Sequence, residues 1–418
     1  MTDTVLPLPA WVGTLELDEG ASGFPDDLPE RFRGARLLLT RGGRPLRVVD
    51  LAVTAGQVDR ATLGAHLPVE DRADEESHGG RGDVAPGSPP TGRSLPSTWV
   101  AVPTHDRPEH LAMLLDHLAA LPDPDVALLV VDNGPSDDRT RDLVLARARA
   151  DPRLRYVRER VAGTSRARNR ALAEAHEHGV DVVAFVDDDV TMRPGWLAAV
   201  RGAVADAAVA GAPVSCVTGP VLAGTLETVS QLASDGALGW TAGFTARRFA
   251  LDDPSAAALF PFAPGEYGVG ANFAVVVADA LAVGGFDELL GGGSPTRGGE
   301  DIEFWVRLVT SGRVLAYEPA AWLWHHHRDS ERALHAQLAG YARGLGGYLG
   351  AVACHRRMRA LALRRLPRAV AHVEGVRRRE RAVGVGVSAG GFAPAAVLRG
   401  LATYLWCRLV RRCRRTGW

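Results

Sequence analysis

Apolar and polar positions alternate along the middle of the chain in a pattern that predicts strands followed by helices. Each of four short apolar runs ends in a polar loop, at residues 98–103, 126–131, 154–157 and 182–186. Runs of this length suit strands that are buried on both faces of a parallel sheet. Between the first two runs, leucines recur at helix spacing, at Leu111, Leu114, Leu115 and Leu118. The repeated strand, loop and helix predict an α/β fold, with a Rossmann-like, mainly parallel sheet and helices on both faces.

The 418-residue chain exceeds one typical domain and divides into four parts. Residues 1–67 hold strand-like runs around Arg41-Gly42-Gly43-Arg44-Pro45, which predicts a β-hairpin in a small β-rich module. Residues 68–97 are rich in Gly, Pro, Ser and acidic residues and predict a flexible linker. Residues 98–330 carry the strand and helix pattern, and residues 331–418 predict a basic helical extension.

The C-terminal extension contains 18 arginines and three acidic residues, while the whole chain has a net charge of −1. The apolar segment 398–409, which includes Tyr404 and Trp406, is flanked by arginines. Such a helix could lie on an anionic membrane surface. The alternative is a helix packed on the preceding domain with a solvated basic face. Charge alone would also allow nucleic-acid binding, but no recognition motif supports it, and we expect no nucleic-acid partner.

The spacing of the cysteines and the hydropathy of the chain bear on the cellular compartment in which we expect the protein. The four cysteines have neither metal-ligand nor disulfide-scaffold spacing, which favours a reducing environment. No signal-peptide pattern and no membrane-spanning apolar run is present. We therefore expect a cytoplasmic protein, which the basic tail could bring to the inner face of the membrane.

Three consecutive acids, Asp187, Asp188 and Asp189, follow the apolar run V-V-A-F-V. Open α/β sheets bind ligands at the carboxyl ends of their strands, where these acids would lie. Three neighbouring carboxylates repel one another, and Mg²⁺ or Mn²⁺ would relieve that repulsion because both metals prefer oxygen ligands. A solvated acidic turn is the alternative for this motif taken alone.

An ordered set of motifs surrounds these acids. P-T-H-D-R, V-V-D-N-G-P-S-D-D, G-T-S-R-A-R-N-R and F-V-D-D-D-V come first, and G-A-N-F, G-G-F-D-E and G-E-D-I-E-F-W follow. In this order and spacing, residues 99–328 resemble the inverting, nucleotide-sugar-dependent family 2 glycosyltransferases of bacteria, which have the GT-A fold.

The resemblance implies a nucleotide-diphosphate sugar as donor and assigns residues to it. Asp132 would accept a hydrogen bond from the nucleobase, Gly163 would let the backbone approach the donor, and Asp188 would lie near the ribose. The full donor-binding set is Pro103, Thr104, Asp106, Asp132, Gly163, Arg168, Asn169 and Asp188. For the aspartates the alternative role is a turn residue, and for Arg168 a solvated helix face.

The same resemblance places a divalent metal, Mg²⁺ or Mn²⁺, on Asp189, with Asp187 in a supporting role. A histidine after the E-D helix often completes the set in related enzymes, and this chain has three in succession from His325 to His327. On an extended strand, His325 and His327 face one side and His326 the other. We favour His325 and then His327 as the ligand, with a structural histidine as the alternative.

On the acceptor side, the resemblance makes Asp301 the general base that removes the proton of the acceptor hydroxyl. Glu300, Asn272 and Trp305 would support the acceptor or the base. The glycine-rich segment 291–299 would form a mobile loop over the donor. Glu300 and Asp301 could also cap the helix that follows, which is compatible with catalysis.

These patterns predict an inverting, metal-dependent glycosyltransferase with a hydroxyl-bearing acceptor. The acceptor class stays open among a cell-envelope glycan, a lipid-linked saccharide, a small metabolite and a peptide. The Q-x-x-R-W motif of processive polysaccharide synthases is absent. A non-catalytic sugar-nucleotide- or glycan-binding relative is the alternative, although such a relative would be expected to lose its acids first. A nucleotidyltransferase is a more remote alternative. Such enzymes normally carry a glycine-rich loop with arginine and lysine after the first strand, and the P-T-H-D-R loop has neither glycine nor lysine.

Overall fold

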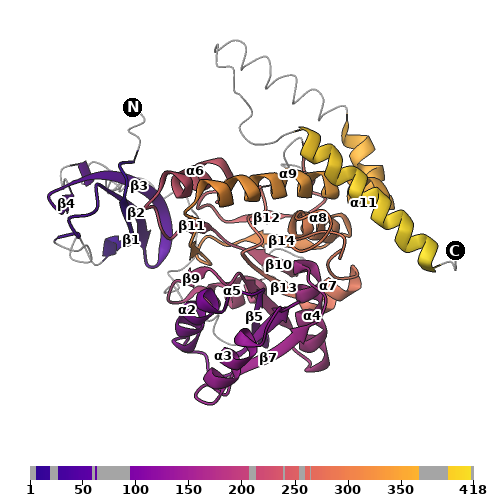
Figure 1. Cartoon of the computed structure of the whole chain (residues 1–418), viewed down its shortest axis with the longest axis horizontal. Coiled ribbons are helices and arrows are strands. Elements are labelled where there is room, and N and C mark those ends of the chain that lie inside the picture. Colours follow the sequence, from indigo (N-terminus) through magenta and orange to yellow (C-terminus); the bar gives the residue numbers. More distant parts are fainter. Residues whose placement is uncertain are drawn as a thin grey trace, which may run out of the picture.

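We describe the protein from a computed structural model (Figure 1). It describes residues 6–18, 27–58, 62–63, 95–206, 213–238, 241–253, 259–263, 265–366 and 394–415. Nearly all of the predicted linker at 68–97 lies outside these ranges.

The N-terminal module is a four-stranded sheet in the order β1-β2-β3-β4. Its strands are β1 (Ala10–Glu16), β2 (Gly34–Arg41), β3 (Arg44–Thr54) and β4 (Gln57–Val58). The predicted hairpin is present as the antiparallel pair β2 and β3, joined at Gly42 and Gly43, both of which have positive φ. β1 pairs parallel to β2, which the sequence pattern did not predict. Leucines and valines of these strands form a small core of their own.

An eight-stranded sheet forms the centre of the molecule, in the order β12-β14-β10-β13-β8-β5-β6-β7. The strands are β5 (Thr98–Thr104), β6 (Ala127–Asn133), β7 (Leu154–Glu159), β8 (Val182–Val186), β10 (Val214–Thr218), β12 (Arg247–Phe249), β13 (Asn272–Val276) and β14 (Val314–Tyr317). β5, β6, β7 and β8 pair in parallel, as does β10 with β14, whereas β12 and β13 run antiparallel to their neighbours. The predicted α/β class is therefore confirmed, and the four predicted strands are the parallel half.

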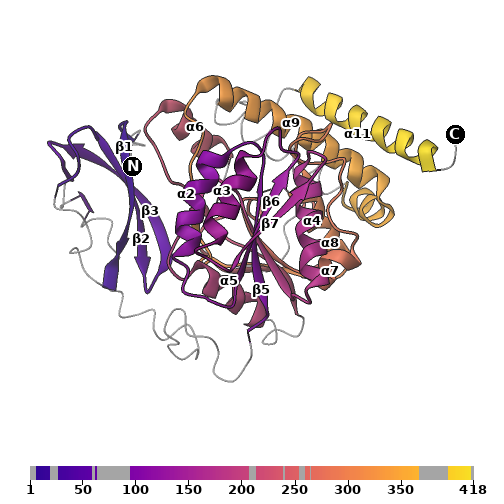
Figure 2. The same ribbon diagram turned by 60° about the horizontal axis from the view of Figure 1, so that its bottom comes forward.

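Alternate strand residues face two separate cores, because side chains alternate across a strand. Ala101 and Phe185 pack on one face, and Val102 and Val186 on the other. The first face is covered by α4 (Thr164–Glu177), α7 (Val277–Ala282) and α8 (Glu300–Thr310). The second is covered by α2 (Pro108–Ala119), α3 (Arg139–Ala148) and α5 (Trp196–Ala205). Figure 2 shows these two helical layers on either side of the sheet.

A small third sheet lies beside the acidic turn. It contains β9 (Val190–Met192), β15 (Leu323–His325) and β11 (Val221–Ala223), with β15 in the middle. β15 runs antiparallel to β9, and His325 pairs with Val190. This pairing brings the histidine segment next to Asp187–Asp189, more than a hundred residues earlier in the sequence.

The C-terminal extension is helical where described. α9 (Glu331–Cys354) is followed by a helical run at 356–366 and, after a gap in the description, by α11 (Pro394–Arg415). α9 and α11 approach closely at glycines: a side chain at Gly346 would meet the backbone of α11, and one at Gly400 the backbone of α9. α6 (Val229–Leu238) lies near the start of α9, next to the N-terminal module (Figure 1).

Candidate active site

Residues at the carboxyl edge of the parallel strands form the candidate site. Asp187, Asp188 and Asp189 make the turn between β8 and β9, while Thr104 ends β5 and Asp132 lies near the end of β6. Thr104 Oγ1 donates a hydrogen bond to Asp188 Oδ2 at 2.7 Å. Because the parallel strands end together, the predicted donor-side acids are gathered at one edge of the sheet.

Arg107, which follows the first strand, bridges two of the acids. Its Nη1 lies 2.5 Å from Asp188 Oδ1, and its Nη2 lies 2.8 Å from Asp189 Oδ2. The guanidinium thus supplies positive charge to the acidic turn. Arg107 is not among the residues predicted for the site, although it stands within the P-T-H-D-R motif.

The three carboxylates differ electrostatically. Desolvation by the surrounding protein raises the pKa of Asp187, even though 41% of its side chain is exposed. Burial also raises the pKa of Asp188, against the opposing charge of Arg107. Burial would raise the pKa of Asp189 as well, but His325 and Arg107 together lower it. Asp189 is therefore the acid most strongly held in its charged form.

Among the described residues, one set of side chains has the spacing of a metal site: Asp187, Asp189 and His325, whose ligand atoms lie within 4.8 Å of one another. Asp189 Oδ1 is buried and receives no well-formed hydrogen bond from the described groups, although His325 Nε2 lies 3.1 Å away. The two carboxylates suit Mn²⁺ or Mg²⁺, and one imidazole is acceptable in such a mixed site. His327 is outside this set, and Asp187 is inside it.

The three histidines are held in different ways. His325 Nδ1 lies 3.1 Å from His327 Nδ1, and both rings are buried. His326 points the other way, as the strand periodicity predicted. Its two ring nitrogens lie 2.9 Å from Thr191 Oγ1 and 2.8 Å from Thr225 Oγ1. The His326 backbone N–H also donates to the Asp189 carbonyl at 2.9 Å, which ties β15 to the acidic turn.

Asp132 is fully buried and accepts a 2.7 Å hydrogen bond from the Tyr156 hydroxyl through Oδ2. No group in the described ranges donates a hydrogen bond to its other oxygen, Oδ1. Burial raises the pKa of this carboxyl group. A buried acceptor without a donor is costly unless a ligand supplies one. The unpaired oxygen therefore fits the predicted contact to a nucleobase.

The other donor-side residues shape the loops around this edge. Asp106 has φ 52° and accepts a 2.9 Å hydrogen bond from Ser136 N, which lowers its pKa. Pro103 is half-buried on β5. Gly163, at φ 151°, precedes α4, and its N–H donates to Asn133 Oδ1 at 3.0 Å. The Asn169 side chain makes two hydrogen bonds to the backbone of Phe286. Its Nδ2 donates to the Phe286 carbonyl, and its Oδ1 accepts from Phe286 N.

Arg168 links residues predicted for the donor side to residues predicted for the acceptor side. It is 3% exposed, and its guanidinium lies 3.0 Å from Glu300 Oε1 and 3.9 Å from Asp187 Oδ1. It also donates to the Gly270 carbonyl at 2.9 Å. Burial raises the pKa of Glu300, against the charge of Arg168. The structure thus gives Arg168 a buried bracing position in place of a solvated helix face.

Asp301 lies on the first turn of α8, half-buried. Its Oδ2 accepts a 3.0 Å hydrogen bond from Gly270 N, and its Oδ1 a 2.8 Å bond from Ile302 N. These two backbone donors fix the carboxylate. Burial raises the pKa of the Tyr341 hydroxyl on α9, and the charges of Asp301, Asp187 and Glu300 raise it further. No sequence motif identified Tyr341.

Two predicted acceptor-side residues are packed inside the protein. The Asn272 side chain accepts from Trp196 Nε1 and donates to the carbonyls of Pro220 and Ala321. Trp305 is 1% exposed and packs edge-on against Phe273. Both can support the site by fixing strands and α8. The predicted mobile loop at 291–299 is anchored in this structure by the buried Thr296, which donates to the Leu289 carbonyl at 2.7 Å.

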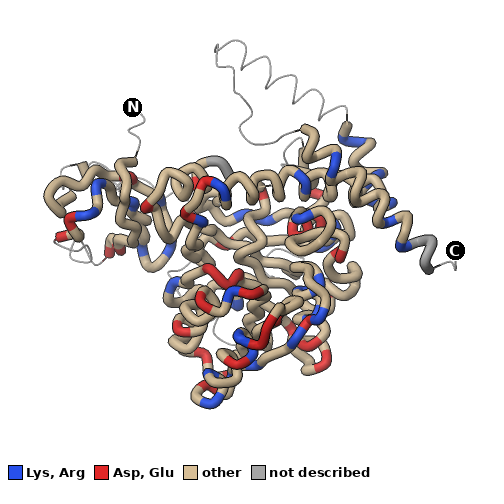
Figure 3. Tube along the Cα trace, in the orientation of Figure 1, with Lys and Arg blue, Asp and Glu red and all other residues tan. Residues whose placement is uncertain are grey.

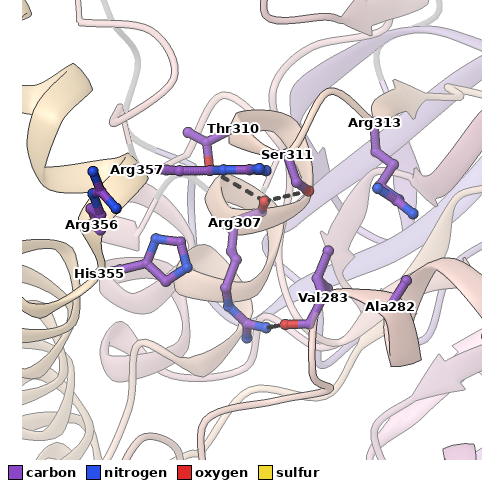
Figure 4. Close-up of a pocket in the computed structure, with 9 residues that line it drawn as sticks. All are labelled: Ala282, Val283, Arg307, Thr310, Ser311, Arg313, His355, Arg356 and Arg357. Atoms are coloured by element: carbon purple, nitrogen blue, oxygen red, sulfur yellow. Dashed lines mark hydrogen bonds between the residues drawn. The ribbon is translucent and has the colours of Figure 1, made fainter.

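A separate cavity of about 400 Å³ lies away from these acids (Figure 4). It is lined by Ala282, Val283, Arg307, Thr310, Ser311, Arg313, His355, Arg356 and Arg357. None of the predicted site residues lines it.

The chain that carries this site is similar to known glycosyltransferases. Residues 99–255 match the family model described as glycosyl transferase family 2. The pre-mycofactocin glycosyltransferases of two Mycobacterium tuberculosis strains are 29% identical to this chain over 326 residues. The match covers 76% of this chain and 62% of those proteins, so the chain spans less than two thirds of their length. The central part of this chain is therefore similar to glycosyltransferase family 2.

Two solved structures are more distantly similar. The mannosyltransferase PcManGT from Pyrobaculum calidifontis, in complex with GDP-Man and Mn²⁺, is 18% identical, with a TM-score of 0.48 over 78% of this chain and 90% of that one. Residues 1–349 of S. aureus TarS, in complex with UDP-GlcNAc, are 15% identical, with a TM-score of 0.46 over 77% of this chain and 92% of that one.

Proposed function

We propose that this protein transfers a sugar from a nucleotide-diphosphate sugar to an acceptor hydroxyl, with inversion at the anomeric carbon. The observation that carries the proposal is the gathering of Asp132, the acidic turn, His325 and Asp301 around one edge of the sheet, with Arg168 between the donor and acceptor sides. The match to the family model and the glycosyltransferase relatives support it. Residues 98–330 would form the catalytic unit.

The donor would bind across the ends of β5, β6 and β8. The unpaired Asp132 Oδ1 would accept a hydrogen bond from the base, and Asp188, held by Thr104 and Arg107, would face the ribose. The N–H groups at the start of α4, after Gly163, are suited to the diphosphate. The nucleotide and the sugar stay open.

Asp187, Asp189 and His325 would hold the divalent metal, because their ligand atoms are close together and Asp189 is kept charged. A cation bound there would offset the negative charge that develops on the departing diphosphate. Arg107 already supplies part of that positive charge from the protein side.

Asp301 would act as the general base. The acceptor oxygen would form a bond to the anomeric carbon while the bond from that carbon to the diphosphate oxygen breaks. The hydroxyl proton would pass to the Asp301 carboxylate, which Gly270 N and Ile302 N hold in place. One displacement at this carbon gives one inversion. Glu300 and Arg168 would keep the base oriented.

An anionic membrane is our proposal for a further partner, and α11 offers the surface. Its outward side carries apolar residues at helical spacing, Leu398, Ala402, Leu405, Trp406 and Leu409. The exposed Arg399 and Arg411 flank this stripe, and basic residues recur along α9 and α11 (Figure 3). An apolar stripe with tryptophan and flanking arginines suits an interfacial helix. No helix in the described ranges has both the length and the apolar character to cross a bilayer.

A nucleotide-binding panel tests the proposed function. UDP, GDP and dTDP are each added with Mn²⁺, Mg²⁺ or EDTA, and the melting temperature is recorded. We expect one nucleotide to stabilise the protein, since a ligand at 100 times its Kd adds about 2.7 kcal/mol. Asp189→Ala should remove the metal-dependent part, and Asp252→Ala, at an exposed aspartate elsewhere, should not.

The panel also separates the proposal from its alternative. If no nucleotide stabilises the wild type, the proposal is contradicted. If a nucleotide binds tightly and EDTA leaves the binding unchanged, the metal dependence is contradicted. Donor binding without transfer to any acceptor would favour a non-catalytic relative.

A further inference from the structure

The N-terminal module lies directly beside β11 and α6 (Figure 1). Leu38 of β2 forms a buried cluster with Leu222 of β11 and Trp322, which precedes β15. The start of β1 continues this contact, because Ala10 N donates to the Leu226 carbonyl at 2.8 Å. β11 and β15 are paired strands, so the module rests on the small sheet that ends in His325.

A chain of charged and polar side chains runs from this module to the acidic turn. Arg36 of β2 makes a bidentate ion pair with Asp50, with contacts of 2.6 and 2.7 Å, and its Nη1 also contacts Asp235 of α6. Asp235 Oδ1 lies 3.9 Å from His327 Nε2. His327 Nδ1 lies 3.1 Å from His325 Nδ1, and His325 Nε2 lies 3.1 Å from Asp189 Oδ1.

The members of this chain are shielded from solvent. The Arg36 side chain is 14% exposed, that of Asp235 23%, and those of His325 and His327 are 8% and 1% exposed. Charges in such positions interact more strongly than exposed ones. The Arg36–Asp235 contact is therefore more shielded from solvent than the Arg31–Glu227 pair across the same interface, whose side chains are 65% and 44% exposed.

The two histidine rings are held between two carboxylates. Only one proton can lie between two Nδ1 atoms that are 3.1 Å apart, so the rings contact each other through a single shared position. Asp235 Oδ1 faces Nε2 of His327, and Asp189 Oδ1 faces Nε2 of His325. This arrangement directs His325 Nε2 at the candidate metal site, as groups behind a metal ligand commonly do.

We propose that the N-terminal module is a working part of the active site, in which Arg36 and Asp235 act as positioning residues that set the orientation of His325 through His327. Arg36 holds Asp235 in place, Asp235 orients His327, and His327 orients His325. This inference rests on the proposed function for the role of His325 as a metal ligand.

The test uses the full chain and two readouts other than activity. The first is ¹⁵N NMR of the histidine rings in metal-free protein, which reports the tautomer of each ring. The second is Mn²⁺ affinity, measured from the EPR signal of free Mn²⁺ with UDP or GDP present. The variants are Arg36→Met, Asp235→Asn and the conservative Arg36→Lys. Arg31→Met is the matched control at the same interface.

We expect Arg36→Met and Asp235→Asn to change the ¹⁵N shifts of His325 and His327 and to weaken Mn²⁺ binding by about 10- to 100-fold, the usual effect of removing such a partner. Arg36→Lys should restore much of the affinity, and Arg31→Met should match the wild type. Asp235→Asn keeps the argument testable if Arg36→Met unfolds the module.

Unchanged ring shifts and Mn²⁺ affinity in both Arg36→Met and Asp235→Asn would overturn the inference, as would an equal loss in Arg31→Met. Wild-type protein that binds no Mn²⁺ with either nucleotide would instead count against the proposed metal site, and the NMR arm would still decide whether Arg36 and Asp235 hold the two histidine rings.

Discussion

Removing one partner of the buried ion pair between Arg307 and Glu303 should strongly destabilise the protein around α8, the helix that carries Asp301. Arg307 donates to both Glu303 oxygens at 2.8 Å, and its remaining donors reach the carbonyls of Val283 and Gly285 at 2.5 and 2.6 Å. The two side chains are 9% and 4% exposed. Arg307→Leu would leave the Glu303 carboxylate buried and unpaired.

Removing one partner of a buried pair costs roughly 3–5 kcal/mol, because the other charge loses its compensation. The matched control is Arg313→Leu. Arg313 pairs with Asp279 at 2.9 Å, but the two side chains are 29% and 27% exposed, and pairs close to the surface contribute about 0–1 kcal/mol. We therefore expect the free energy of unfolding to fall by about 3 kcal/mol more in Arg307→Leu than in Arg313→Leu.

Urea unfolding followed by tryptophan fluorescence measures this difference. The double variant Glu303→Leu with Arg307→Leu should recover much of the lost stability, because apolar residues of similar volume often replace a buried pair without loss. A single variant no less stable than Arg313→Leu would refute the reasoning. A double variant as unstable as Arg307→Leu would show that the unpaired carboxylate is not the cause.

Three further predictions concern separate parts of the molecule. Asp132→Ala should weaken nucleotide binding by about 10- to 100-fold in a calorimetric titration, since hydrogen bonds to charged groups contribute roughly 1.5–3 kcal/mol; unchanged affinity would remove Asp132 from the donor site. Trp406→Glu should reduce sedimentation with anionic vesicles, while Leu145→Glu, at an exposed leucine on α3, should not, and equal sedimentation of both variants would count against membrane contact through α11. Burial raises the pKa of the Cys216 thiol, so a thiol reagent at pH 8 should label the partly exposed Cys354 first and Cys216 only in denaturant; early labelling of Cys216 would contradict its buried position.

The strands and helices of the nucleotide-binding half could be predicted because their pattern is local. Leu111, Leu114, Leu115 and Leu118 recur at helix spacing, and the structure buries all four on α2. The apolar run before Asp187 is similarly continuous and forms the buried strand β8. The parallel pairing of β1 with β2 could not be predicted, since it joins segments whose connection carries no pairing signal.

The candidate site could be predicted only as far as its residues lie in short motifs. The motifs identified Asp132, Asp189, His325 and Asp301, but not which neighbours would pair with them. Arg107 reaches the acids across some eighty positions of sequence, and no spacing rule connects them. The set with metal-site spacing contains Asp187, whereas the sequence predicted His327. Which of the two belongs to the set depends on how β9 and β15 pair, which is a tertiary contact.

The central claim is that Asp301 removes the proton of the acceptor in an inverting transfer. The most direct test compares Asp301→Asn with the wild type, using the nucleotide-sugar that the panel identifies and a set of hydroxyl acceptors. The account predicts that the transfer rate falls by roughly 10²–10⁴-fold, the usual contribution of general-base catalysis, while donor affinity stays nearly unchanged. Transfer by Asp301→Asn at the wild-type rate, or a wild-type product that retains the configuration of the donor, would contradict it.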